Sequence, residues 1–365
     1  MSNDYYTSYL RLKPEEEGGG FPKPRFSVQE LLQHLVSATE QLTGEDLFAF
    51  SDLSRADAAL LRQEWLLMPP KQRQGLVSAL VELALDDLDW HLGRFLRVAM
   101  DDPDEAVRRT AIEGLWEDSE ADLLGPLIQM LRQDKSEEVR AAAAKALGAY
   151  VLAGELDELD AALAMRAEEA LLAILQSPIE PIAVQASALE SIAYSGETGV
   201  RQLIEDSYYA PDEDLRVSSL IAMGHSADTR WRGLARAELQ NPSPAMRAEA
   251  ARACGELEAK KAEADLLALL ADDEQIVRLA AIEALGHLGG RKAREALRVI
   301  TQGDESVEAE AADAALEEML SFGDTDGIRL LDEDDADESD DPDFAPWDNA
   351  DDFDDEALGS YDKEM

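Results

Sequence analysis

Hydrophobic positions recur along most of the chain with a long and regular period. An aliphatic residue, which we call the anchor, is followed four positions later by Ala or Ser and three positions after that by another small residue. The anchors are Val107, Val139, Val184, Leu215, Met246, Val277 and Val307. They are separated by steps of 32, 45, 31, 31, 31 and 30 residues, a period typical of helical repeats.

Each period contains two stretches of apolar residues at helical spacing, separated by a short polar turn. We therefore predict one helical hairpin per period and an all-α solenoid of about seven to eight hairpins. A weaker copy of the pattern begins at Leu76, 31 residues before Val107. The 45-residue step holds about 14 extra residues, which we place between the two helices of that hairpin, around residues 151–163.

The predicted first helices carry start and stop residues. Pro244 stands at the favoured first helical position. A glycine closes several units, and we expect it to leave the helix with a positive φ angle. Three residues before five anchors stands an Asp or Ser whose side chain can cap the first turn; these are Asp104, Ser136, Asp212, Ser243 and Asp304.

The segments on either side of the repeats differ from them. Residues 1–25 contain Pro, Glu and Gly runs and are expected to form a disordered tail. Residues 26–69 are expected to form capping helices, over 26–42 and 46–68, and residues 70–321 the solenoid. Residues 322–365 hold 19 acidic residues against Arg329 and Lys363, so we expect self-repulsion to keep this acidic tail disordered.

Three segments carry a family resemblance: DDPDEAVRRTAIEGL (101–115), DKSEEVRAAAAKALG (134–148) and DDEQIVRLAAIEALG (272–286). They resemble HEAT repeats of the phycobilisome-lyase type, which implies a stack of HEAT-like hairpins over about residues 70–320. Some related repeats belong to lyases that attach or detach bilin chromophores. Others belong to deoxyhypusine hydroxylases, di-iron enzymes that use His-Glu dipeptides, and no histidine here is followed by Glu.

The chain is strongly acidic, with 79 Asp and Glu residues against 33 Lys and Arg, a net charge of −46. Like charge on this scale repels phosphate backbones and anionic membranes, so we expect neither nucleic acid nor a membrane as partner. Cys254 is the only cysteine, which fits a reducing compartment. The first residues lack a secretory pattern and no apolar run is long enough to span a bilayer, so we expect a cytoplasmic protein.

No residues suggest catalysis. His34, His91, His225 and His287 are not paired at helical spacing as metal ligands are. His225 and His287 occupy the same point of two hairpins, near a helix C-terminus that favours a cation. Cys254 is expected to be a small buried apolar residue. We therefore predict no enzyme, no cofactor and no metal.

Basic residues at two places could bind a ligand. An arginine follows five anchors, namely Arg108, Arg140, Arg216, Arg247 and Arg278, and we favour a structural ladder in which each bonds the acidic turn of the adjacent hairpin. Gln185 and Glu308 interrupt this series. The later second helices carry Arg230, Arg232, Arg236, Lys260, Lys261, Arg291, Lys292, Arg294 and Arg298. If second helices line the concave side, these residues form a stripe for an acidic peptide; solvated surface charge is the alternative.

The leading hypothesis is a non-catalytic scaffold that binds a protein segment on its concave face. The acidic tail would regulate it by competing for that face or by recruiting a basic protein, with Phe344, Trp347 and Phe353 as anchoring aromatics. One alternative is a bilin-lyase-like or other HEAT-repeat enzyme subunit, for which the sequence offers no candidate catalytic residue. Another is an acidic chaperone or nucleic-acid mimic that binds a basic protein.

Overall fold

The computed structural model describes residues 25–37, 42–86, 89–116, 118, 120–303 and 306–323. Most of them lie in one compact unit that ends at Met319. Helices account for its regular structure. Their bounds are α1 Val28–Ser37, α2 Gly44–Leu47, η1 Phe48–Phe50, α3 Arg55–Glu64, η2 Trp65–Leu67, α4 Pro70–Asp86, α5 Gly93–Ala99, α6 Glu105–Glu113, α7 Ala121–Gln133, α8 Glu137–Glu155, α9 Ala161–Leu175, α10 Ile182–Ile192, α11 Thr198–Tyr208, α12 Glu213–His225, η3 Thr229–Trp231, α13 Arg232–Glu238, α14 Pro244–Glu256, η4 Lys260–Ala262, α15 Glu263–Leu269, α16 Gln275–Leu288, α17 Arg291–Thr301 and α18 Val307–Gly323.

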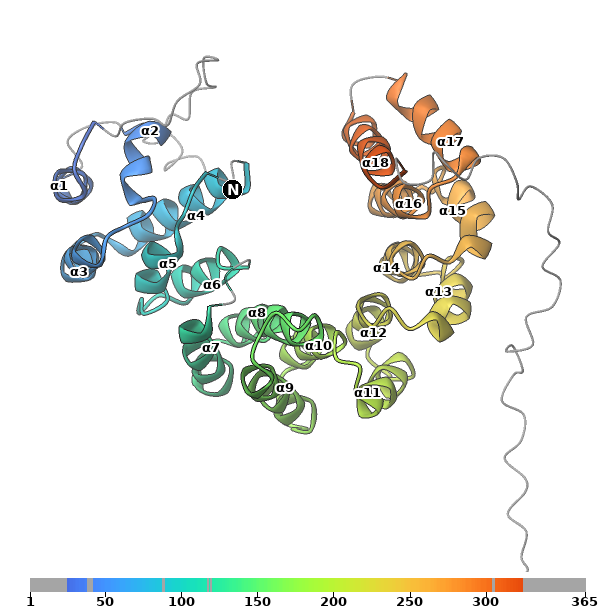
Figure 1. The fold of residues 1–365 in the computed structure, drawn as a ribbon, viewed down its shortest axis with the longest axis horizontal. Helices are drawn as coiled ribbons and strands as arrows, with labels where there is room; N and C mark the ends of the chain where they lie inside the picture. The colour runs from blue at the N-terminus through green and yellow to red at the C-terminus, as the bar shows by residue number, and fades with distance from the viewer. Residues whose placement is uncertain are drawn as a thin grey trace, which may run out of the picture. The chain divides into compact units, whose positions relative to one another are not determined.

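Helices from α4 onward form two rows (Figure 1). The first helix of each hairpin lies in the first-helix row, α4, α6, α8, α10, α12, α14, α16 and α18, and the second helix in the second-helix row, α5, α7, α9, α11, α13, α15 and α17. Neighbours within the first-helix row pack extensively on one another, whereas neighbours within the second-helix row make few contacts. This arrangement confirms the predicted all-α solenoid.

The N-terminal helices are shorter than expected. Instead of one helix over residues 26–42, α1 ends at Ser37, and residues 38–41 lie outside the described residues. The expected second helix is broken into α2, η1 and α3 by a turn in which Asp52 has a φ angle of 46°. Thr43 and Asp46 form a capping box at the start of α2, and the buried Asp46 carboxylate also pairs with Arg25. Contacts of α1 with α3, and of α3 with α5, connect these helices to the solenoid.

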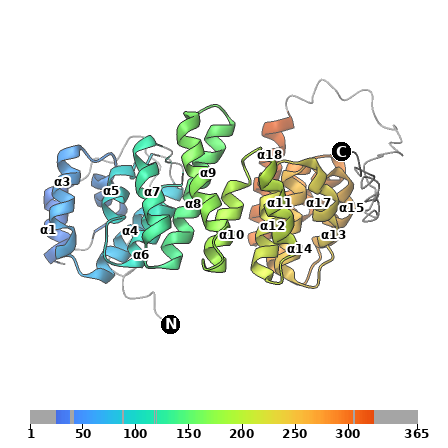
Figure 2. The ribbon, with the colours of Figure 1, turned by 90° about the horizontal axis from the view of Figure 1, so that it is seen from below.

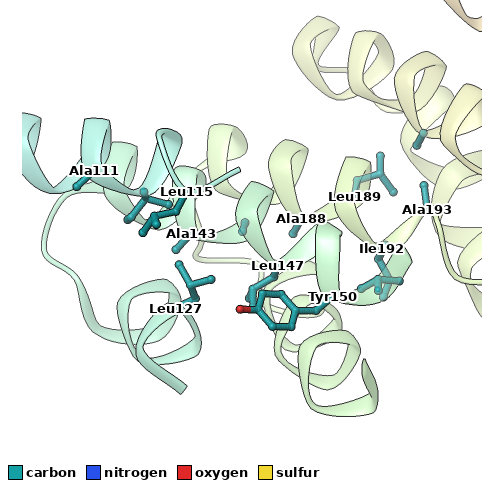
Figure 3. Packing of buried hydrophobic residues seen from close by; sticks show 14 of the residues in the cluster. Ala111, Leu115, Leu127, Ala143, Leu147, Tyr150, Ala188, Leu189, Ile192 and Ala193 are labelled. Carbon is teal, nitrogen blue, oxygen red and sulfur yellow. The ribbon is translucent and has the colours of Figure 1, made fainter. Parts of the chain in front are cut away.

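The core is continuous from hairpin to hairpin (Figure 3). Leu127 of α7 packs with Leu147 and Tyr150 of α8, and Ala188 of α10 continues the same layer. All four side chains are buried, and each leucine contributes about 1.5–3 kcal/mol by leaving water. The Tyr150 hydroxyl donates to the Glu120 carbonyl at 2.9 Å. Because each hairpin completes its neighbour's core, the hairpins stabilise one another.

The extra residues of the long repeat lengthen both of its helices. α8 has 19 residues and α9 has 15, against 13 in α12 and in α14. Their joined ends extend beyond the neighbouring hairpins (Figure 2). The sequence placed the insertion correctly, at the junction of the two helices.

The glycines that close the repeat pattern lie inside helices, so the prediction of a positive φ angle at these positions was wrong. Gly255 and Gly286 lack a side chain because the next first helix approaches closely. A Cβ atom on Gly255 would lie 2.8 Å from the Ala284 Cα, and one on Gly286 would lie 2.9 Å from the Ala315 Cβ. The chain leaves these helices a few residues later, at Ala227, Glu258 and Gly289, where φ is 50°, 50° and 66°.

The predicted caps are largely confirmed. Asp104 and Asp212 each accept hydrogen bonds from two amides of the following turn, and Ser136 accepts one from Val139. Ser243 stands at the cap position before Pro244, but its hydroxyl donates to Glu213 at 2.7 Å instead. Asp304 lies outside the described residues.

Candidate protein-binding surface

The arginines that follow the anchors join consecutive hairpins. Each guanidinium donates through Nη1 to a carbonyl six residues earlier, in its own turn, and most also reach a carboxylate of the next hairpin. These ion pairs are Arg108–Asp134 at 2.7 Å, Arg140–Glu180 at 3.3 Å, Arg247–Asp272 at 2.8 Å and Arg278–Glu308 at 2.7 Å. The predicted structural ladder is thereby confirmed at four arginines. Arg216 is the exception, since it reaches only its own turn and Glu213 at 3.8 Å.

Several residues of the predicted basic stripe bond within the solenoid. Arg230 pairs with Asp228 at 2.9 Å, and Arg236 pairs with Asp265 at 2.7 Å. Arg232 donates to the Leu257 carbonyl at 2.7 Å, and Lys292 pairs with Glu263 at 3.4 Å. Lys260 and Lys261 are exposed on η4. Three of these contacts, those of Arg232, Arg236 and Lys292, link consecutive hairpins, whereas the pair of Arg230 lies within one hairpin.

The remaining three residues lie along α17. Arg291, Arg294 and Arg298 form no ion pair with any carboxylate in the described part of the chain, and the buried Nε of Arg294 has no hydrogen-bond partner there. The helix is strongly amphipathic because Ala293 and Leu297 point into the core while the opposite face is open. Val299, 66% exposed, adds an apolar side chain to that face. A shallow hollow of about 420 Å³ lies against it, lined by Arg291, Arg294, Glu295, Arg298, Val299 and Gln302.

This basic face lies on the second-helix row. From α12 to α16 the first helices are the closely packed row, and in a bent stack the closely packed row lies on the inside of the bend. The second helices therefore form the outer row, and the expectation that their basic residues line a concave side was wrong. The sequence shows which residues share a helix face, but the side toward which a stack bends depends on packing distances between helices.

The first-helix row carries a cluster of carboxylates that sequence reasoning missed. Glu256 lies over Gly224 of the preceding hairpin, where its carboxylate occupies the space that a side chain at Gly224 would need. Desolvation, reinforced by Glu283 and Glu249, raises the pKa of Glu256 to about 7, against the opposing effect of Arg252. Burial also raises the pKa of Glu190 and of Glu249. The repeat pattern gives little signal for this cluster, because Glu256 is the one carboxylate among the residues ten positions after these anchors, Tyr194, His225, Glu256 and His287.

The histidines and the cysteine have structural environments. His225 stacks on Tyr194 with ring centroids 4.5 Å apart, and its Nδ1 donates to the Glu190 carbonyl at 2.9 Å. Burial lowers the pKa of His225, which disfavours the cation expected at this helix end. His287 lies 3.7 Å from Glu318. Cys254 is fully buried, as predicted, and burial raises the pKa of its thiol to about 12.

Other candidate features of the chain can be stated briefly. Among the residues that the structure describes, no three His, Cys, Asp or Glu side chains are grouped as metal ligands would be. None of the described helices is long and apolar enough to cross a membrane. Phe344, Trp347 and Phe353 lie outside the described residues.

The chain was compared with curated proteins and with solved structures. Among curated proteins, no significant sequence match was found. The phycocyanin lyase CpcE–CpcF complex of Nostoc sp. PCC7120 shares 19% identity over 62% of this chain and 94% of its own, with a TM-score of 0.42. Human deoxyhypusine hydroxylase shares 18% sequence identity over 80% of this chain and 96% of its own, with a TM-score of 0.32. An archaeal HEAT-like repeat protein of Thermococcus onnurineus NA1 shares 16% sequence identity over 73% of this chain and 99% of its own, with a TM-score of 0.33.

A family profile described as HEAT repeats matches residues 93–176 and 234–317. These two regions contain α5 to α9 and α13 to α18, and the helices between them continue the same two rows. Solenoids of this kind are suited to protein–protein interaction because they present extended rows of exposed helix faces. The chain therefore contains HEAT repeats in two regions, residues 93–176 and 234–317, within one solenoid of helical hairpins.

Proposed function

We propose that the chain is a non-catalytic adaptor that binds an acidic segment of a partner protein along the exposed face of α17. The observation that carries the proposal is that Arg291, Arg294 and Arg298 form no ion pair with a carboxylate in the described part of the chain, although the net charge is −46. A guanidinium group binds a carboxylate through two parallel hydrogen bonds, which gives direction as well as attraction. Val299 beside them offers contact to an apolar side chain of the ligand.

The acidic tail is proposed as a regulator of this surface. Residues 322–365 carry 19 carboxylates together with Phe344, Trp347 and Phe353, the same chemistry that α17 would recognise in a partner. A covalently attached competitor acts at a high effective concentration and raises the partner affinity needed for displacement. We place this adaptor in the cytoplasm, where the lone Cys254 stays reduced.

The test is binding of a fluorescent peptide with the sequence of residues 340–353, measured by anisotropy with the full chain at low salt. Replacement of Arg291, Arg294 and Arg298 by Gln should weaken binding at least about tenfold. The matched control replaces Lys71, Arg132 and Arg166, which are exposed on other helices, and removes the same charge. Equal weakening in both variants would show that only net charge matters and would overturn the α17 surface. Truncation after Gly323 should strengthen peptide binding if the tail competes.

A second candidate function is binding of a basic protein segment on the first-helix row, as an acidic chaperone would do. The raised pKa values of Glu249 and Glu256 favour it, because a cation placed among these carboxylates relieves their mutual repulsion. A lysine-rich peptide should bind the full chain and lose affinity when Glu249, Glu256 and Glu283 become Gln. Unchanged affinity in that variant would exclude this surface.

A further inference from the structure

Five junctions between consecutive hairpins are crossed by an arginine–carboxylate ion pair, and we call these pairs the ladder; the Arg140–Glu180 pair is the weakest, because the Glu180 Oε2 accepts no hydrogen bond from it. Arg73 and Asp102 form the first and most deeply buried of them, at 2.6 Å. Arg108–Asp134, Arg140–Glu180, Arg247–Asp272 and Arg278–Glu308 are the others. A partly buried, charge-assisted bond of this kind is stronger than a bond between neutral groups and fixes the register of two neighbouring turns.

Two successive junctions, on either side of α12, lack a ladder bond among the described residues. At the junction of α10 and α12, Gln185 replaces the arginine and bonds only the Glu180 carbonyl of its own turn, while Ala210 stands where the next carboxylate would be. At the junction of α12 and α14, Arg216 is present but Asn241 stands at the carboxylate position, five residues before the anchor, that Asp134 and Asp272 occupy in other hairpins.

The packing of α12 differs from that of the first helices on either side of it. α12 packs less extensively on α10 and on α14 than α8 packs on α10 or α14 on α16, and more extensively than the shorter α6 packs on α4 or on α8. Ser219 of α12 stands where α14 and α16 have Ala250 and Ala281, and its buried hydroxyl bonds the Arg216 carbonyl of its own helix rather than a neighbour.

We infer that α12 is a joint in the solenoid. The hairpins from α4 to α10 and those from α14 to α18 behave as two stiffer blocks, and the unladdered junctions on both sides of α12 let the blocks change their mutual angle. The stack bends where neighbouring turns are not held in register, because small rotations at one junction are amplified along the row. The joint would let the scaffold adapt to partners of different shape, and it does not depend on which ligand α17 binds.

Other bonds cross these junctions, among them that of His225 to the Glu190 carbonyl and that of Arg232 to the Leu257 carbonyl, but among the described residues none of them is a two-pronged ion pair. Ser218 donates to Glu190 at 2.7 Å and Ser243 donates to Glu213 at 2.7 Å. On the second-helix row, Arg201 pairs with Asp228 at 3.1 Å through an arginine side chain that is 44% exposed. Single hydroxyl bonds and exposed ion pairs adjust more easily than a bidentate ladder pair and are worth less.

The ladder can be restored by two substitutions. Asn241 donates to Glu238 at 2.5 Å, so an aspartate alone would meet a neighbouring carboxylate. The variant Glu238→Gln/Asn241→Asp keeps the net charge and presents a carboxylate to Arg216, whose Nη1 bonds the turn as that of Arg247 does. Glu238→Gln alone is the control. Asp272→Asn is the mirror variant, which removes a ladder bond from the junction of α14 and α16.

Two measurements on the full chain test the joint. Spin labels at Ala173→Cys and Gln302→Cys, both exposed, report the spread of distances between the blocks, while buried Cys254 stays unlabelled. The restored ladder should narrow this spread, the mirror variant should broaden it, and Glu238→Gln should leave it unchanged. Amide hydrogen exchange in α12 should be about tenfold faster than in α14 and should slow in the restored variant. Exchange in α12 as slow as in α14, or an unchanged spread in the restored variant, would overturn the joint.

Discussion

Arg247 and Asp272 form a two-pronged ion pair between consecutive hairpins, with Nε and Nη2 lying 2.9 and 2.8 Å from the two carboxylate oxygens. Both side chains are largely buried. The hydrogen bonds from Arg247 lower the pKa of Asp272, and the same contact raises the pKa of Arg247. The pair therefore stabilises the ionised carboxylate within the fold.

Replacement of Arg247 by Met should lower the free energy of unfolding by about 2 kcal/mol, because it leaves the Asp272 carboxylate without its partner. The matched control is Arg230→Met, whose pair with Asp228 is exposed on the arginine side and should cost less than about 0.5 kcal/mol. Urea unfolding followed by circular dichroism measures both. Equal losses would mean that Arg247 acts through general charge rather than through its bond.

The pH dependence of this pair has a definite sign. The folded-state pKa of Asp272 is below its unfolded value, so the contribution is fully present above the unfolded pKa and is lost as the pH falls through the folded one. The difference in stability between the parent chain and Arg247→Met should therefore shrink in acid. A difference that stays constant down to pH 2 would contradict the linkage.

The repeat pattern predicted the hairpins, the insertion and the ladder because each depends on residues close in sequence or at the same repeat position. Val107, for example, is buried, and Arg108 reaches the next turn as its position indicates. The repeat pattern could not show which residues of the predicted basic stripe form ion pairs and which, like those on α17, do not. Arg236 forms an ion pair with Asp265, whereas Arg298 forms none with the described carboxylates. This difference depends on distances between neighbouring second helices, and the repeat period does not give those distances.

Gly255 should tolerate no side chain. In Gly255→Ala the new Cβ would lie 2.8 Å from the Ala284 Cα, so α14 and α16 would have to separate. We expect a loss of about 1–3 kcal/mol. Gly199→Ala in α11 is the control, because nothing lies within 4 Å of its added Cβ and alanine's helix propensity should stabilise it by about 0.5–1 kcal/mol. The two variants should shift the thermal midpoint in opposite directions; a shared direction would contradict the close approach at Gly255.

Replacement of Glu258 by glycine should stabilise the fold. Its φ angle of 50° is strained for a residue with a side chain, and the equivalent position of the next hairpin is Gly289 with a φ of 66°. Glu258→Gly should stabilise the chain by about 1 kcal/mol. Gly289→Ala, the reverse exchange at the equivalent position, should destabilise it by a similar amount. Thermal unfolding measures both, and a loss of stability in Glu258→Gly would show that the glutamate side chain contributes more than its backbone strain costs.

Glu256 should make the chain less stable as the pH rises. Its folded-state pKa of about 7 lies above the unfolded value of 4.5, so the folded state holds the proton longer, and stability falls between about pH 4.5 and pH 7. Glu256→Gln removes this loss and should raise the thermal midpoint by about 2–4 °C at pH 8, which corresponds to about 1 kcal/mol after allowance for solvent screening. At pH 5 the gain should nearly vanish. The exposed Glu169→Gln is the control, and an equal gain for both variants at pH 8 would assign the effect to net charge instead of to the cluster around Glu256.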